Sequence, residues 1–252
     1  MPPPRDPRPR SQQIAAELRA DIMAGEHQPG QRLPSTADLM ATYKTVSATI
    51  QNALNILKAE GYLEGRPGIG VFVRATQQQT ITPADYARPY SPGEPYAWIT
   101  AAAEHGRRGA YRLLDVGEVP APVQVAAAFN LDPGAPVLRR QMVGTIDDEP
   151  VELVCTFYPL DLAAGTALTQ KRLIKGGSPA VLAELGVEPA RFEDVISTRP
   201  PTSEEFVALE LPTEVPVLRT FRVAVAASGR PVECQLMVKA GHRHEVRYRW
   251  PS

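Results

Sequence analysis

The amino-acid sequence predicts an α+β protein of two domains, the first mostly helical and the second built on an antiparallel sheet. Three observations lead to this prediction. Residues 32–73 have the pattern of helix, tight turn, helix and β-hairpin. Residues 123–233 contain a unit of helix, turn and hairpin twice. Between these regions, residues 75–95 are polar and rich in proline, as linkers are.

Length and composition exclude several classes of protein. The chain has 252 residues, enough for two domains with cores of their own. It has no run of about 18 apolar residues, so we expect no membrane partner. Residues 1–10, MPPPRDPRPR, lack the apolar centre of a secretory signal, so we expect a disordered arm and a cytoplasmic protein. We expect Cys155 and Cys234 to be free thiols. The four histidines show no metal-ligand spacing, so we expect no metal and no cofactor.

The first domain is expected to begin with a helix over residues 11–25, where apolar residues recur every four positions. Ser35 followed by Asp38 has the form of a capping box, which predicts a short helix over 36–43. A further helix is expected over 46–60, and a β-hairpin with a glycine-rich tip follows it. This order is the layout of a winged helix-turn-helix, whose second helix lies in the major groove of DNA.

The residues of this region resemble the DNA-binding domain of the GntR family of bacterial transcription regulators. The matches keep the order and spacing of the family, and they are PGQRLPS at 29–35, Leu39, Thr49-Ile50, Ala53-Leu54, EGYL at 60–63, and the wing residues Gly68, Gly70, Phe72 and Val73. The resemblance implies that the partner is double-stranded operator DNA.

The second domain contains an internal repeat. Residues 131–152, LDPGAPVLRRQMVGTIDDEPVE, match residues 211–233, LPTEVPVLRTFRVAVAASGRPVE. In both copies, Pro-Val-Leu-Arg begins a strand. A turn follows this strand, and Pro-Val-Glu then begins the return strand. A short helical piece precedes each copy, at Val123–Asn130 and Ser203–Glu210, and another helix is expected at Ser178–Leu185. Two such units predict an α+β domain around an antiparallel sheet.

This region resembles the effector-binding UTRA domain, which has the chorismate-lyase fold, and the combination is similar to the HutC-type branch of the GntR family. The matching residues are Glu118-Val119-Pro120, Leu131, Pro133-Gly134, Pro136 to Arg140, Pro150-Val151, Tyr158-Pro159, Thr202, Glu204-Glu205, Leu209, Leu211, and Arg230 to Glu233. The fold class implied is therefore α+β, with an N-terminal winged helix-turn-helix and a C-terminal chorismate-lyase-like UTRA domain.

Four segments are expected along the chain. They are a disordered arm at 1–10, the winged helix-turn-helix at 11–75, a linker with a short helix at 76–109, and the UTRA-like effector-binding and dimerisation domain at 110–252. Residues 1–75 carry nine basic and seven acidic side chains. This weak positive balance suits a sequence-specific dimer better than a non-specific binder of nucleic acid.

In the recognition helix, the family commonly has arginine at the positions of Ser47 and Gln51. Amide side chains suit adenine, so we expect Gln51 and Asn52 to read bases. A solvated helix surface is the alternative role for these two side chains. We expect Lys44 and Thr49 to contact phosphates, which position the protein without specifying sequence.

The wing also departs from the family pattern, because the usual arginine at its tip is Ile69. We expect Arg66 to take its place, while Gly68 and Gly70 allow close approach of the backbone. The arginine that usually follows the LPS element is Ala37. The candidate DNA-binding residues are Arg32, Ser35, Thr36, Lys44, Thr45, Ser47, Ala48, Thr49, Gln51, Asn52, Arg66, Gly68 and Gly70.

The effector site lacks the residues that hold anions in the family. Members that bind phosphorylated sugars or small acids have arginines at the positions of Met142 and Gly144, and an acid at Val154. We therefore expect an effector of low negative charge, cationic or largely apolar, between the two hairpins, oriented by Arg140 and Glu233. A salt bridge at the hairpin edge is the alternative role for Glu233. The candidate effector-binding residues are Arg140, Met142, Gly144, Val154, Thr156, Tyr158, Glu233, Gln235 and Lys239.

The two resemblances together imply a homodimeric, sequence-specific transcriptional regulator. We expect a repressor that a small-molecule effector releases from a palindromic operator. Two alternatives stay open, an effector-free architectural DNA-binding dimer and an enzyme of chorismate-lyase-like fold. Glu118, Glu152 and Glu233 are the acids available to an enzyme, but the sequence has no nucleophile grouping and no phosphate loop. We therefore expect no catalytic residues and no enzymatic activity.

Overall fold

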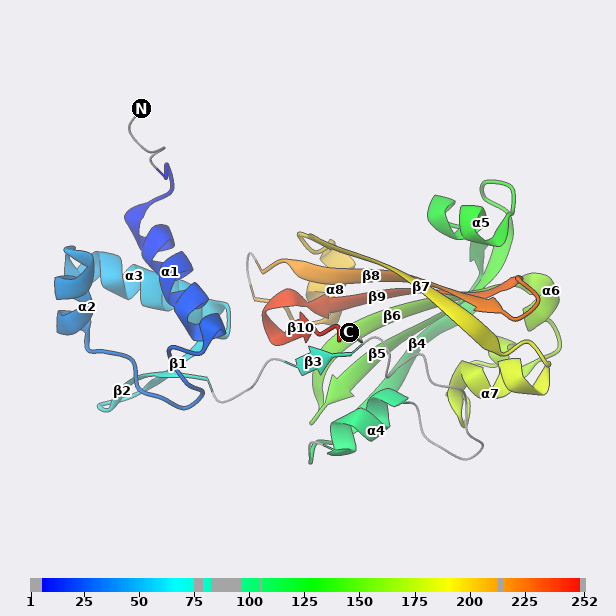
Figure 1. The fold of residues 1–252 in the computed structure, drawn as a ribbon, viewed down its shortest axis with the longest axis horizontal. Helices are drawn as coiled ribbons and strands as arrows, with labels where there is room; N and C mark the ends of the chain where they lie inside the picture. The colour runs from blue at the N-terminus through cyan, green and yellow to red at the C-terminus, as the bar shows by residue number, and fades with distance from the viewer. Residues whose placement is uncertain (1–5, 75–78, 83–96, 105, 213–214, 250–252) are drawn as a thin grey trace. The chain divides into compact units, whose positions relative to one another are not determined.

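The structure, a computed structural model, describes residues 6–74, 79–82, 97–104, 106–212 and 215–249 (Figure 1). The chain divides into two units, residues 1–78 with 212–215 and residues 79–211 with 216–252. Residues 1–5 of the expected arm and most of the expected linker lie outside the described residues. No helix in the part described is long and apolar enough to cross a membrane.

The N-terminal unit is the expected winged helix-turn-helix. Its elements are α1 (Arg10–Ala24), α2 (Thr36–Tyr43), α3 (Ser47–Ala59), β1 (Leu63–Arg66) and β2 (Gly70–Val73). The strands β1 and β2 pair as an antiparallel hairpin, which is the wing (Figure 1). The predicted helices and hairpin are therefore confirmed, with helix ends within a residue or two of the expected positions.

The core of this unit lies between α1 and α3. Ile14 and Leu18 of α1, together with Ile50, Leu54 and Leu57 of α3, are all at most 2% exposed. These residues recur at helical spacing, so each helix turns one apolar face to the other. The opposite face of α3 is left uncovered by this packing.

The ends of α2 are fixed by local interactions. Ser35 Oγ accepts a hydrogen bond from the Asp38 backbone N–H at 3.2 Å, and Asp38 Oδ2 accepts one from the Ser35 N–H at 3.1 Å. This reciprocal pair is the predicted capping box. At the other end, Lys44 has φ 48°, a left-handed conformation that stops α2 and begins the tight turn. The capping box therefore sets where the helix-turn-helix starts.

The C-terminal unit is an antiparallel sheet of six strands in the order β4-β5-β6-β9-β8-β7 (Figure 1). Its elements are β3 (Gln79–Ile81), α4 (Ala97–Glu104), β4 (Gly109–Pro120), α5 (Val123–Phe129), β5 (Pro136–Ile146), β6 (Glu149–Pro159), α6 (Leu160–Ala163), α7 (Gly177–Glu184), β7 (Pro189–Arg199), α8 (Ser203–Ala208), β8 (Val217–Ala226), β9 (Pro231–Ala240) and β10 (His244–Val246), with 3-10 turns at Ala167–Thr169 and Gly241–Arg243. The α+β fold class is confirmed.

The internal repeat is confirmed as two hairpins, β5–β6 and β8–β9, each preceded by its helix, α5 or α8. Each unit also starts with a strand that the repeat did not predict, β4 in the first copy and β7 in the second. The copies meet where β6 pairs with β9, with Glu152 opposite Lys239 and Phe157 opposite Cys234. The sheet is therefore made of two similar three-stranded halves.

The two faces of the sheet are covered by different helices. On one face, α5 and the end of α8 pack on residues such as Phe157, Val217 and Val238. On the other, α6 and α7 pack on Leu138 and Tyr158. We call this second side the α7 face. Cross-strand partners share a face, so all of the candidate effector residues lie on the α7 face.

One short strand pair lies outside the large sheet. Gln79–Ile81 of β3 pair in parallel with His244–Val246 of β10. Thr80 Oγ1 also donates a hydrogen bond of 2.6 Å to Glu245 Oε1. This part of the expected linker is thus a strand of the C-terminal unit.

We predict that Ser35→Ala lowers the free energy of unfolding of α2 by about 1 kcal/mol, because both hydrogen bonds of the capping box depend on this serine. Hydrogen exchange of the α2 amides in the full chain measures the change. Ser47→Ala is the matched control, since α3 starts after Val46 without a side-chain cap. Equal protection of α2 in the two variants would contradict the prediction.

Candidate DNA interface and effector cavity

The uncovered face of α3 carries short polar side chains. Ser47, Ala48, Gln51, Asn52 and Asn55 are exposed, and they alternate with the buried core positions of the helix. Thr49 is half-buried. An exposed polar face on the second helix of a helix-turn-helix is the surface that can enter a DNA groove.

Three of the candidate side chains on this side, those of Ser35, Thr36 and Gln51, have partners within the domain. Gln51 Nε2 donates a hydrogen bond to Thr36 Oγ1 at 3.0 Å, so the amide is tied to the first turn of α2. Ser35 Oγ donates to Asp38 Oδ2 at 2.6 Å in addition to its capping bond. Gln51 is therefore oriented before DNA arrives, and the Ser35 side chain serves the capping box.

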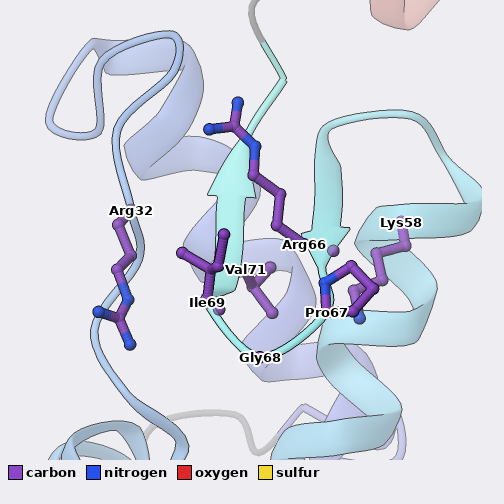
Figure 2. Close-up of a pocket in the computed structure, with 9 residues that line it drawn as sticks. Arg32, Lys58, Arg66, Pro67, Gly68, Ile69 and Val71 are labelled. Carbon is purple, nitrogen blue, oxygen red and sulfur yellow. The ribbon is translucent and has the colours of Figure 1, made fainter.

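Arg66 is engaged on the wing itself. Its Nε and Nη2 donate hydrogen bonds of 3.0 and 2.8 Å to Glu64 Oε1, and its guanidinium lies 4.2 Å from the centre of the Phe72 ring. Figure 2 shows this guanidinium at the far end of the hairpin from the tip at Gly68. This geometry does not favour Arg66 for the position expected of it, the cation at the wing tip.

Arg32 lies closer to that position. It bridges to Phe72 from the segment beside β2, and Figure 2 shows its side chain running toward the level of the tip. A Cβ at Gly70 would come within 2.7 Å of Arg32 Nε, and Gly70 has φ 142°. Gly70 therefore leaves the space that the Arg32 side chain occupies. Arg32 has no ion pair among the residues that the structure describes.

A hollow of about 550 Å³ lies at the wing (Figure 2). It is lined by Arg32, Lys58, Gly65, Arg66, Pro67, Gly68, Ile69, Gly70 and Val71. Lys58, from the last turn of α3, was not expected from the sequence. Its Nζ lies 3.4 Å from where a Cβ at Gly65 would be. The hollow thus brings together three basic side chains, of which Arg66 alone has a salt bridge within the described part.

The second candidate site is a cavity of about 450 Å³ in the C-terminal unit. It is lined by Pro179, Leu182, Gly186, Glu188, Pro189, Ala190, Phe192, Arg222, Ala226, Ala227, Ser228, Glu233 and Gln235. These residues come from α7, β7, β8 and β9 and from the loops joining them. Two of the candidate effector residues, Glu233 and Gln235, line it. The cavity therefore belongs to the second copy of the repeat.

Glu233 is the buried acid of this cavity, at 5% exposure. Its Oε2 accepts hydrogen bonds of 2.7 Å from both Tyr158 Oη and Ser178 Oγ. Burial raises the pKa of Glu233, while these two donors and the positive charge of Arg222 act to lower it. Burial, with the nearby charge of Glu233, also raises the pKa of Tyr158 well above its usual range.

Arg222 and Asp194 form a pair that the sequence did not predict. Arg222 Nε and Nη2 donate hydrogen bonds of 2.7 Å each to the two carboxylate oxygens of Asp194. In the sheet register, Gln235 is opposite Arg222, which is opposite Asp194. The sequence could have indicated this pair only through strand alternation, which places these three side chains on the α7 face.

Arg140 does not reach the cavity. Its Nη1 donates to the carbonyl oxygens of Leu168 and Gln170 at 2.6 and 2.8 Å, and its Nη2 to that of Arg172 at 2.7 Å. The side chain is 2% exposed. This geometry gives Arg140 a structural role in holding the segment after α6, in place of the ligand contact expected with Glu233.

The remaining candidates fill the α7 face without lining the cavity. Met142, Val154 and Thr156 are buried. Lys239 forms a buried ion pair with Glu152. At Gly144, a Cβ would lie 3.2 Å from Cε1 of the Tyr111 ring. An aromatic ring therefore occupies the space beside Gly144, the position at which some family members have an anion-binding arginine.

Comparison with known proteins identifies both units. Residues 10–73 match the description "Bacterial regulatory proteins, gntR family", and residues 104–245, more than half of the chain, match "UTRA domain". The chain is a GntR-family transcriptional regulator with a UTRA domain. Regulators of this family bind DNA through the helix-turn-helix, and UTRA domains bind small-molecule effectors.

Relatives of this GntR-family regulator cover nearly its whole length. The HTH-type transcriptional regulator SCO4628 of Streptomyces coelicolor is 27% identical over 248 residues, 95% of this chain and 92% of that protein. A crystal structure assigned to a GntR-family regulator is 26% identical, covers 97% of this chain and 98% of its own, and has a TM-score of 0.63. PhnF from Mycobacterium smegmatis shares the fold at a TM-score of 0.58, with 22% identity over 95% of this chain and 99% of its own.

We predict that Arg32→Ala weakens DNA binding about tenfold and lowers the slope of log affinity against log salt by about one, as the loss of one phosphate contact would. Arg66→Ala is the matched comparison, and it should leave that slope nearly unchanged because Glu64 already pairs with this arginine. Fluorescence anisotropy over a salt series measures both. A larger loss of slope in Arg66→Ala than in Arg32→Ala would contradict the assignment of Arg32 as the phosphate contact of the wing.

Proposed function

We propose that this regulator is a homodimeric repressor that binds a palindromic operator and leaves it when a small molecule binds the UTRA domain. The observation that carries the DNA-binding part is the exposed polar face of α3, which begins at the tight turn after Lys44. A regulator of this kind works in the cytoplasm, beside the DNA. Its relatives with helix-turn-helix domains are transcriptional regulators, which supports regulation over enzymatic activity.

Each chain brings one recognition helix, and one helix covers only a few base pairs. Two chains related by a two-fold axis would place two such helices in successive major grooves on one side of DNA. We therefore propose half-sites about one helical turn apart. Gln51 and Asn52 would contact base edges, whereas Lys44, Thr49 and Arg32 would contact phosphates.

The effector part of the proposal is carried by the cavity beside Glu233. Its volume of about 450 Å³ is in the range of small-molecule sites. A formed cavity favours an effector-binding regulator over an effector-free architectural dimer. An effector can release DNA only if it binds more tightly to an arrangement whose recognition helices are wrongly spaced, and it shifts the equilibrium by that difference in affinity.

We predict that Gln51→Ala relaxes sequence preference at one or two operator positions, costing about 1–3 kcal/mol there. Thr36→Val is the control that removes the hydrogen bond to Gln51 but keeps the amide, and it should have a smaller effect. Lys44→Ala should weaken binding evenly over all sequences. Selection of bound sequences from a random pool measures these profiles, and an unchanged profile in Gln51→Ala would favour a solvated helix surface.

We also predict two chains per operator and a binding site with two-fold symmetry in the DNA upstream of the regulator's own coding sequence. Footprinting and mass photometry of the complex measure the symmetry and the stoichiometry. Changing the half-site separation by half a helical turn should abolish tight binding, because the second recognition helix would face away from its groove. One chain bound per site, with no loss on changing the spacing, would contradict the dimer.

A further inference from the structure

The cavity beside Glu233 has an unbalanced negative charge. Arg222 is the basic residue that lines it, and both carboxylate oxygens of Asp194 already accept hydrogen bonds from that guanidinium. Glu188, at the cavity wall, adds a second, exposed carboxylate. Glu233 therefore forms no salt bridge of its own among the described residues, although it is 5% exposed. A buried charge without a partner is unfavourable, so the site favours a positively charged ligand.

The internal repeat shows that, within the described ranges, Glu233 lacks the salt bridge that the corresponding acid of the first copy forms. Glu152 and Glu233 both follow Pro-Val at the start of the return strand in their copies. Further along those strands, Tyr158 of the first copy corresponds to Lys239 of the second. At the β6–β9 pairing, Glu152 meets Lys239 in a buried ion pair, whereas Glu233 meets Tyr158. The protein supplies an ammonium group to one acid and a neutral phenol to its counterpart.

The hydrogen bonds of Glu233 leave one oxygen for a ligand. Oε2 accepts from two hydroxyl donors, Tyr158 Oη and Ser178 Oγ, an arrangement that stabilises the ionised carboxylate. Oε1 has no donor within the described part of the chain. Gln235, half-buried on the same strand, adds an amide to the cavity wall. A ligand with N–H donors can therefore bind Oε1 directly.

The rest of the wall is largely apolar. Pro179 and Leu182 of α7, Phe192 of β7 and Ala226 of β8 line the cavity. Such a lining binds a hydrocarbon or aromatic body and excludes water from the charged pair. It offers little to a sugar, whose hydroxyl groups each need a hydrogen-bond partner.

We propose that this cavity binds a small organic cation, a primary ammonium group carried on an apolar body, with the ammonium on Glu233 Oε1. This ligand would supply the charge that Lys239 supplies to Glu152. The inference rests on the proposed function for its role as effector, but binding itself does not depend on DNA.

The test uses three probes with the same ring and different charge, namely benzylamine, benzyl alcohol and benzoate. Thermal unfolding and titration calorimetry of the full-length protein measure binding. Benzylamine should raise Tm and bind at least about tenfold more tightly than benzyl alcohol, and benzoate should not bind. Tighter binding of benzoate, or of glucose 6-phosphate, than of benzylamine would overturn the proposal.

Glu233→Gln removes the charge and keeps the shape, so benzylamine should lose its advantage over benzyl alcohol. Glu184→Gln is the matched control, because Glu184 ends α7, is exposed and does not line the cavity. Undiminished benzylamine binding in a folded Glu233→Gln variant would overturn the proposal.

Ser178→Ala tests the same acid if Glu233→Gln does not fold. Benzylamine binding requires ionised Glu233, so it should be lost as pH falls through the pKa of that carboxyl. Removing the Ser178 donor raises this pKa further, and the loss should then begin at a higher pH than in wild type. The other titratable groups around the acid are Tyr158, Glu188, Asp194 and Arg222. An unchanged pH profile in Ser178→Ala would count against Glu233 as the ammonium site.

Operator binding without ligand separates this proposal from the proposed function. Intact operator binding with no binding of benzylamine would overturn the cation site and leave the regulator proposal standing. Benzylamine binding that depends on Glu233, in a protein that fails to bind any operator, would support the cation site and contradict the regulator proposal.

Discussion

The pairing of β6 with β9 is the contact on which the effector domain depends. It joins the two copies of the repeat, and it carries Glu152, Thr156 and Tyr158 on one strand opposite Lys239, Gln235 and Glu233 on the other. Neither copy alone could bury these groups, because each hairpin would expose an unpaired strand edge. The pairing therefore completes the sheet and creates the polar centre of the α7 face in a single step.

The local structure of the chain could be predicted from the sequence where short-range rules apply. The capping box at Ser35, the stop of α2 before the turn, and the glycine-rich wing all depend on residues close to one another in sequence. The repeated Pro-Val-Leu-Arg and Pro-Val-Glu segments located both hairpins of the sheet. The edge strands β4 and β7 were not predicted, because their half-exposed sequences differ between the copies.

The candidate sites were predicted only in part, because they depend on long-range placement. The α7 face and Glu233 followed from strand alternation and family resemblance. Two contacts join residues far apart in sequence, and no local pattern specifies them. They are the contact of Arg140 with the carbonyl groups around Gln170 and that of Arg222 with Asp194. The same holds at the wing, where Lys58 comes from the preceding helix. The sequence shows which side chains are charged, but only the fold shows which of these charges already form salt bridges with one another.

The β3–β10 pair has a consequence for how the protein is made. The winged helix-turn-helix is stabilised by contacts between neighbouring segments, so it can fold as soon as it leaves the ribosome. The strand β3 is translated next, but its partner β10 follows every strand of the large sheet in the sequence. During translation the DNA-binding domain is therefore complete well before β3, the strand that follows it, can pair with β10 of the UTRA domain. A nascent chain can hold a folded DNA-binding domain while β3 still has no partner strand.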